Sequence, residues 1–400
     1  MAYKPKKEIL DKYADLLVNF ALNSGEGVKE GEIVFLSVPE SAKPLLLSLR
    51  RAVLQAGAHP IIQYHPDGIA REFFEIASNA QLKFFPGKYL KGQVREADHV
   101  IGISAEIDKR ELEGIQPKKI MTRSKVYKPY WDWREEKEVK GEFTWTLALY
   151  ATSAMAKEAG LTLERFWNQI IKACYLDLKN PIRKWQKTQK EIERIKVKLN
   201  KLKIEKLHIK SKNTDLTIGI GRGRIWVGGS GRNIPSFEIF TSPDCRVVEG
   251  DISFNQPLYR YGNLIKGVRL KFEDGKVAEV KADQGEDILK EMLLVKGADQ
   301  VGEISLTDGR LSRITKFMAE TLFDENRGGR QGNVHIALGS AYKDTYPGDS
   351  SKISKKRWKA MGYNDSAIHT DLVSTNDRVV TAYLQGGKRK TIYKNGRFVI

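Results

Sequence analysis

The chain has 400 residues, of which 41% are hydrophobic and 30% charged, and it carries a net charge of +18 at pH 7. This composition excludes an intrinsically disordered protein, and the length predicts two domains. Cys174 and Cys245 lie far apart without CxxC spacing, so we predict neither a disulfide framework nor a thiolate zinc site. Because the sequence has no apolar stretch of about 18 residues and no signal-peptide core, we expect a cytoplasmic protein without membrane contact.

Predicted strands and helices alternate through the first half of the chain. Apolar residues at helical spacing predict a helix over 9–22, which Gly25 and Gly27 end. Further strands are predicted over 33–38, 60–64, 98–103 and 144–148, and further helices over 42–57, 69–77, 153–159 and 163–174. Because such alternation indicates a parallel sheet covered by helices, we predict an α/β N-terminal domain with a mostly parallel sheet over residues 1–180.

The second half begins with a lysine-rich segment and then becomes rich in short strands. Residues 181–205 have apolar side chains at helical spacing and predict an amphipathic helix, whose basic face we interpret as solvated rather than as a binding patch. Strands are predicted over 216–218, 224–227, 268–272 and 276–280, with a hairpin turn at Glu273-Asp274-Gly275. We therefore predict a β-rich α+β C-terminal domain over residues 181–400.

Five polar residues in predicted strands of this half are candidates for chemistry. His369 and Asp371 are two positions apart, so on a strand they share one face and are able to bind one cation or two neighbouring cations. By itself such a pair is more often hydrogen-bonded on a surface strand. His335 interrupts an apolar run and, alone, is more often a satisfied core residue. Glu238 and Glu303 are flanked by apolar residues, and a buried carboxylate needs a partner.

These segments, in this order, resemble the aminopeptidase T (M29) family of metallopeptidases. The resemblance rests on a joint set of short motifs that extends over nearly the whole chain. The motifs are Gly31-Glu32-Ile33-Val34, Ala56-Gly57-Ala58-His59-Pro60, Asn233-Ile234-Pro235, Glu238-Ile239-Phe240-Thr241-Ser242-Pro243-Asp244, Val248-Glu249-Gly250, Gly302-Glu303, Leu322-Phe323-Asp324-Glu325-Asn326, His335-Ile336-Ala337-Leu338-Gly339, Ala341-Tyr342, Asn364, Ser366, His369 and Asp371.

The resemblance implies an aminopeptidase that releases N-terminal amino acids from peptides with a free N-terminus, using water activated by two divalent metal ions. It implies metal ligands at Glu238, Glu303, His335, Tyr342, His369 and Asp371. Oxygen and imidazole ligands without thiolate suit zinc, cobalt or manganese. Glu303 and Glu238 are the candidate catalytic carboxylates, and which of them acts as general base stays open. The family resemblance also implies a homodimer.

Three features depart from the family pattern and concern substrate preference more than metal binding. Residues 327–333 form a longer, basic segment, predicted to be flexible, between the Asp-Glu-Asn run and His335. Phe237 stands where relatives often carry Gly or Glu. The residues after Asp371 lack the expected Phe-Met-Ile-Gly continuation.

Other classes of protein remain as alternatives. The charge of +18, the basic helix and the Arg-Gly-Gly-Arg run at 327–330 suggest a nucleic-acid-binding protein, but no zinc-finger spacing or RNA-recognition motif accompanies them. We therefore expect no nucleic-acid partner. The glycines at 219–223 and 228–231 lack the context of a nucleotide-binding loop and are predicted to serve hairpin turns. A nonenzymatic descendant of the peptidase fold is the third alternative.

Overall fold

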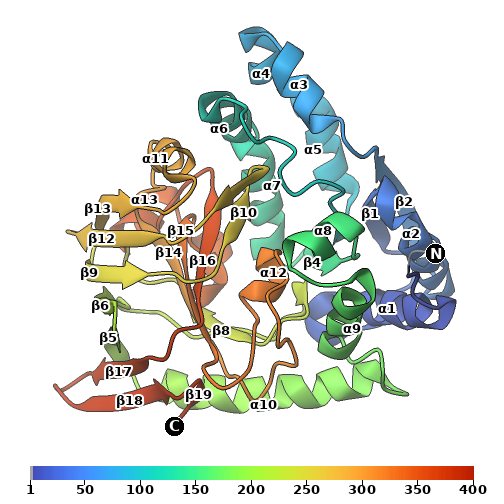
Figure 1. The fold of residues 1–400 in the computed structure, drawn as a ribbon. Helices are drawn as coiled ribbons and strands as arrows, with labels where there is room; N and C mark the ends of the chain where they lie inside the picture. Colours follow the sequence, from blue (N-terminus) through green and yellow to red (C-terminus); the bar gives the residue numbers. More distant parts are fainter. Residues whose placement is uncertain (1–2) are drawn as a thin grey trace.

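A parallel sheet occupies the N-terminal half of the computed structural model, which describes residues 3–400 (Figure 1). Its strand order is β2-β1-β3-β4-β7, and every neighbouring pair is parallel. The strands are β1 (Ile33–Pro39), β2 (His59–His65), β3 (His99–Ser104), β4 (Thr144–Leu149) and β7 (Asn233–Ile234). The interior strand β1 buries Val34, Phe35 and Leu36 in succession, as expected of a strand packed on both faces. The predicted α/β class of this half is therefore confirmed.

The helices predicted around this sheet are present, with bounds that differ by a few residues. They are α1 (Lys7–Asn19), α2 (Lys43–Gln55), α3 (Ala70–Ile76), α8 (Ser153–Glu158) and α9 (Leu163–Ala173). Short 3₁₀ turns lie at Asn23–Gly25 and Glu40–Ala42. Within residues 3–400, no helix has both the length and the hydropathy needed to cross a membrane.

Seven further helices are not among the predicted elements. They are α4 (Asn79–Lys83), α5 (Gly87–Glu96), α6 (Pro117–Val126), α7 (Lys128–Val139), α11 (Glu286–Leu293), α12 (Thr321–Asp324) and α13 (Lys355–Ala360). Helix α7 buries none of its residues, so its sequence has no apolar stripe to show a helical period. Helix α4 is a single turn closed by a capping box between Ser78 and Gln81, a local signal too short for a periodicity argument.

An eight-stranded antiparallel sheet follows the basic helix α10 (Pro181–Lys201), which confirms the β-rich α+β class of the second half. Its order is β13-β12-β9-β6-β5-β17-β18-β19. The strands are β5 (Ile204–Ser211), β6 (Thr214–Gly219), β9 (Val248–Ser253), β12 (Arg269–Glu273), β13 (Lys276–Lys281), β17 (Val379–Leu384), β18 (Arg389–Lys394) and β19 (Arg397–Phe398). The predicted hairpin turn joins β12 to β13.

The strand predicted over 224–227 is wrong. Only Val227 forms an isolated bridge, to Phe240. Two contacts outside any sheet hold this segment instead. The guanidinium of Arg224 lies 3.6 Å from the ring centre of Tyr363, and the Ile225 amide donates to the carbonyl of Thr345.

A four-stranded antiparallel sheet, in the order β16-β15-β14-β8, lies inside this half. Its strands are β8 (Glu238–Thr241), β14 (Val301–Thr307), β15 (Asn333–Gly339) and β16 (His369–Ser374). Three of the four are buried along their whole length. The remaining elements are the hairpin β10 (Leu258–Arg260) and β11 (Asn263–Ile265), and 3₁₀ turns at Lys343–Thr345 and Ser350–Lys352.

The two halves interlock in strands and in cores. Strand β7 completes the parallel sheet, although it follows residue 180. The core beneath that sheet includes Phe237 and Phe323, and the core of the β-rich half includes Phe74 and Ile120. The division between residues 180 and 181 stays a prediction.

Candidate metal centre

Strand register brings the candidate side chains to one face of the four-stranded sheet. Ala337 on β15 pairs with Glu303 on β14 and with Asp371 on β16, so these three side chains point to the same side. His335 is two residues from Ala337 and therefore shares this face. Because Ala337 is small, it leaves space between the two carboxylates.

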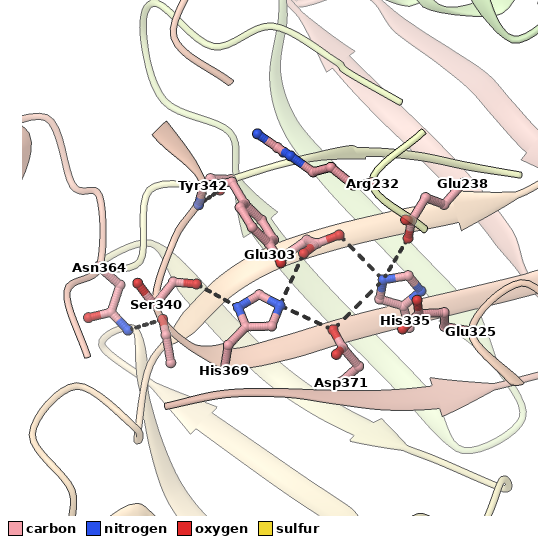
Figure 2. A network of polar contacts seen from close by, with 12 residues as sticks. Arg232, Glu238, Glu303, Glu325, His335, Ser340, Tyr342, Asn364, His369 and Asp371 are labelled. Atoms are coloured by element: carbon pink, nitrogen blue, oxygen red, sulfur yellow. Dashed lines mark hydrogen bonds and ion pairs between the residues drawn. The ribbon is translucent and has the colours of Figure 1, made fainter. Parts of the chain in front are cut away.

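Glu303 lies between the two histidines and faces each with a different oxygen (Figure 2). Its Oε1 is 3.3 Å from Nε2 of His335, and its Oε2 is 3.3 Å from Nε2 of His369. Nε2 of His335 also lies 3.5 Å from Glu238 and 4.0 Å from Asp371. The structure therefore brings five of the six predicted residues into one cluster of facing nitrogen and oxygen atoms.

A backbone carbonyl fixes which ring nitrogen of His369 faces the cluster. Nδ1 of His369 is 2.8 Å from the carbonyl oxygen of Ser340. A carbonyl only accepts, so Nδ1 carries a proton, and Nε2 is the nitrogen that faces Glu303 and Asp371, at 3.3 Å from each. Metal-binding histidines usually have this arrangement, with the outer nitrogen donating to a backbone carbonyl. An Nε2 atom that faces two carboxylates carries either a proton or a bound cation between them.

Glu325 is a further acidic residue of the cluster, which the predicted ligand set did not include. It lies at the C-terminal end of the single-turn helix α12, and its carboxylate groups with His335 and Asp371 within 4.8 Å. The other two groups of ligand atoms at this spacing are Glu238, Glu303 and His335, and Glu303, His369 and Asp371. The Asp-Glu-Asn run of the family motif was the available signal for Glu325.

The pKa values of the side chains in the cluster are shifted because several acidic groups are buried together. Burial raises the pKa of Glu238 to about 7, and the charges of Glu303 and Asp371 add to the rise while His335 opposes it. Burial also raises the pKa of Glu325 well above its usual value, helped by the charge of Glu238. Burial alone would lower the pKa of His335, but the surrounding carboxylates raise it to about 9.

Glu303 and Asp371 show the opposite shift. Burial opposes their ionisation, but the hydrogen bonds and charges of the neighbouring histidines outweigh burial and lower both pKa values. Four carboxylates therefore share one buried cavity with two imidazoles. This donor set fits divalent cations, which would neutralise the excess negative charge.

Tyr342, the sixth predicted residue, lies in the loop after β15 and points into the same cavity (Figure 2). Its ring contacts the imidazole of His369 edge to face at 4.9 Å between centroids, and its amide donates to the hydroxyl of Ser242 at 2.9 Å. The Arg232 guanidinium lies 5.5 Å from the Tyr342 ring centre and pairs with Glu138 and Asp344 at 2.8 and 2.6 Å. These contacts fix the position of the phenol.

The cavity holds about 60 Å³, which is space for only a few water molecules. Residues from both halves of the chain line it, including Trp145 on β4 and the loop residues Gly228, Gly229, Ser230 and Arg232. Gly228 is needed because the backbone passes directly against β8: a Cβ atom there would lie 2.3 Å from the carbonyl oxygen of Glu238. This glycine serves close packing rather than the predicted hairpin turn.

Two departures from the family pattern lie outside the cavity wall. Phe237 is fully buried and stacks on Trp185 of α10, with ring centroids 5.0 Å apart, so its side chain belongs to the core. The segment 327–333 is hydrogen-bonded to its surroundings, since the Gly328 amide donates to the carbonyl of Ile314 and Arg327 donates to Gln256.

An α/β sheet joined to a β-rich half that buries carboxylates and imidazoles around a small cavity is the architecture of a metal-dependent hydrolase. Comparison with known proteins identifies the family: residues 6–398 match the model of the thermophilic metalloprotease (M29) family. The chain belongs to this family.

Relatives and a solved structure match over almost the full length. Aminopeptidase PepS of Streptococcus thermophilus is 30% identical over 422 residues, which cover 98% of each chain. Aminopeptidase T of Thermus aquaticus is 29% identical, covering 98% of this chain and 99% of the relative. The structure of wild-type AmpT from Thermus thermophilus matches with a TM-score of 0.83 at 26% identity, covering 98% of this chain and 100% of that chain.

Proposed function

We propose that this metallo-aminopeptidase releases single amino acids from the free N-terminus of peptides, at a centre that holds two divalent ions. Membership of the M29 family supports a hydrolytic metallo-aminopeptidase. The proposed ligands are Glu238, Glu303, His335, Tyr342, His369 and Asp371, together with Glu325. Zinc, cobalt and manganese all suit these oxygen and imidazole donors.

One observation carries the proposal of two ions. Glu303 turns one carboxylate oxygen to His335 and the other to His369, each at 3.3 Å. The ligand atoms on the His335 side include Glu238, and those on the His369 side include Asp371. Glu303 thus belongs to two groups of ligand atoms at once, as a carboxylate shared by two ions must.

The residues of the cavity favour a particular end of the substrate. Divalent ions bound here would supply positive charge that polarises a peptide carbonyl and activates water. The cluster carboxylates attract the positively charged α-amine of a peptide, and the narrow cavity admits a chain end more readily than a continuous chain. Glu238 and Glu303 are the proposed catalytic carboxylates. Ser340 orients His369, and Arg232 orients Tyr342.

We also propose that the protein works as a homodimer. Large apolar side chains are exposed on the edge strand β2, where Ile61, Ile62 and Tyr64 are 40%, 45% and 41% exposed. Strand β2 has no neighbour on its outer side in the five-stranded sheet, and an open, apolar edge strand favours association with another chain. A second copy of the chain, joined edge to edge at β2, would cover this surface. We propose further that the protein acts in the cytoplasm.

The test is hydrolysis of aminoacyl-p-nitroanilides and short peptides by protein stripped of metal and then reloaded with zinc, cobalt or manganese. Each substrate is paired with its N-acetylated form, and Glu303→Gln is compared with Glu273→Gln, an exposed carboxylate on β12. We expect metal-dependent release of the first residue from free N-termini only, lost in Glu303→Gln and kept in Glu273→Gln. Cleavage of acetylated substrates, or equal activity of both variants, would contradict the proposal.

A further inference from the structure

Two basic segments that are far apart in the sequence meet at one end of the β-rich half. Residues 183–212 contain twelve lysines and arginines against three glutamates, and residues 386–400 contain five lysines and arginines and no acidic residue. Together they account for 14 of the 18 net positive charges of the chain. The first segment forms α10 and β5, and the second forms the β17–β18 turn, β18 and β19.

Hydrogen bonds join the two segments into one surface. The amide of Gln385, at the β17–β18 turn, donates to the carbonyl of Lys203 between α10 and β5. The ammonium group of Lys198 on α10 donates to the carbonyl of Ile400 at 2.9 Å. Strand β17 pairs with β5 on one side and β18 on the other, and one end of α10 lies beside β18 and β19 (Figure 1).

We call nine lysines and arginines on these joined segments the basic surface, and they share two properties. All are exposed, and none is paired with an aspartate or glutamate within residues 3–400. They are Lys198, Lys201, Lys203, Lys206, Lys388, Arg389, Lys390, Lys394 and Arg397. Two of the three glutamates of the first segment, Glu191 and Glu193, pair with Arg194 and Lys196, so they do not neutralise this surface.

The opposite end of the same sheet has a different charge pattern. On β12 and β13, Arg269 pairs with Asp283 at 2.8 Å, and Lys271 pairs with Glu273 at 2.7 Å. Lys281 lies 3.9 Å from Glu279. Each of these three basic residues therefore has an acidic partner on the same face of the sheet. The unpaired excess on α10, β5 and β18 therefore distinguishes this end of the sheet from the β12–β13 end.

We propose that the basic surface binds the phosphate backbone of a nucleic acid, without regard to base sequence. Unpaired lysines and arginines on a rigid support provide the contacts that phosphates take, and such contacts position a nucleic acid without reading its sequence. Lys206, Tyr383 and Arg389 pair across β5, β17 and β18 and so form one row on the sheet. The backbones of Lys206 and Arg389 are therefore two strand spacings, about 10 Å, apart.

The composition of the surface favours phosphates over a protein partner. Protein interfaces are depleted in lysine and anchored by buried aromatic residues, whereas seven of the nine members of the basic surface are lysines. Tyr383 is an aromatic residue of the row, and its ring is already covered by the guanidinium of Arg389 at 4.9 Å. Arg389 thus occupies the ring face on which a base would otherwise stack there, which agrees with backbone binding. The sequence alone favoured a solvated helix, because it does not show that the C-terminal hairpin extends the helix's charge.

The test measures binding of fluorescent single-stranded RNA and duplex DNA to the full chain by anisotropy, from 50 to 300 mM salt, with polyglutamate as competitor. The variant Lys206→Ala/Arg389→Ala/Lys394→Ala is compared with Arg269→Ala/Lys271→Ala/Lys281→Ala, which removes the same charge from the balanced end of the sheet. Hydrolysis of an aminoacyl anilide, expected to be unchanged in both variants, checks that each is folded.

We expect wild-type protein to bind one or both nucleic acids with a steep salt dependence. The first variant should bind at least about tenfold more weakly at 100 mM salt, with the slope of log K against log salt reduced by about 2 to 3. The control variant should stay within about twofold of wild type. Three results would each overturn the proposal: no binding by wild type at 100 mM salt, equal losses in both variants, or displacement by polyglutamate at matched charge concentration.

Discussion

At the scale of single residues, the centre depends on a few groups whose protons and lone pairs are fixed by their neighbours. Ser340 holds the Nδ1 proton of His369, and Glu303 faces both imidazoles. None of these residues has a clear role when considered alone in the sequence. His335 in an apolar run is compatible with a core histidine, and the strand register of the folded chain is what places it opposite three carboxylates.

Tyr342→Phe tests the contribution of a single hydroxyl group. The change removes one oxygen from the cavity and keeps the ring that packs on His369 and Phe240. We expect kcat/KM to fall by about 10²-fold, as for loss of one positioned polar group at a reacting centre, while the free energy of unfolding changes by less than about 1 kcal/mol. Tyr363→Phe, a buried tyrosine that bonds Thr345, is the control in kinetic and urea-unfolding measurements. Equal activity of Tyr342→Phe and wild type would exclude a role for the hydroxyl.

At the scale of elements, alternation and periodicity predicted most of the fold. The strands and helices between residues 33 and 65 follow from apolar runs and a clear helical stripe. Helix α7 was missed because it buries none of its residues and so has no apolar stripe. Glu325 was missed because a single-turn helix, α12, delivers it to the cavity. Contacts that join distant elements, such as Gly228 against Glu238, have no local sequence signal.

Gly228→Ala tests whether the loop before β8 positions the metal centre. The added Cβ atom would meet the Glu238 carbonyl oxygen at 2.3 Å and must displace either the loop or the strand. We expect a loss of activity of at least about tenfold together with a lower melting temperature. Gly386→Ala is the control: its φ is also positive, 86° against 148° at Gly228, but there is open space around its Cβ position. It should cost only about 1 kcal/mol of backbone strain and leave activity unchanged. Equal effects of the two variants would refute the steric explanation.

Glu32 links strands β1 and β3 and gives the stability of this sheet a pH dependence. Burial opposes its ionisation, but bonds from the Lys29 amide and His99 outweigh it and lower its pKa below the ordinary value of 4.5. A lowered pKa stabilises the fold above pH 4.5, and this contribution is lost as pH falls through the lower folded value. We expect Glu32→Gln to be about 1 kcal/mol less stable than wild type at pH 7. In urea unfolding, this difference should shrink below pH 4.5, and a difference that grows on acidification would contradict the assignment.

At the scale of the whole molecule, the exposed apolar edge at β2 predicts association of two copies. Ile62→Lys places a charge in the proposed interface and should convert a dimer to a monomer in light scattering coupled to size-exclusion chromatography. Leu294→Lys, at a side chain that is 72% exposed after α11, should leave the dimer intact. A wild-type monomer, or a dimer that persists in Ile62→Lys, would refute the role of this edge.

The number of divalent ions bound per chain tests the two-ion centre most directly. Metal-stripped protein is titrated with cobalt by calorimetry, and the bound metal is counted after dialysis, for wild type, Glu303→Gln and the exposed control Glu279→Gln. Because Glu303 faces both histidines, we predict two ions per chain in wild type and in the control, and weakened binding of both ions in Glu303→Gln. A single ion in wild type, or two ions bound with unchanged affinity in Glu303→Gln, would contradict a centre built around that shared carboxylate.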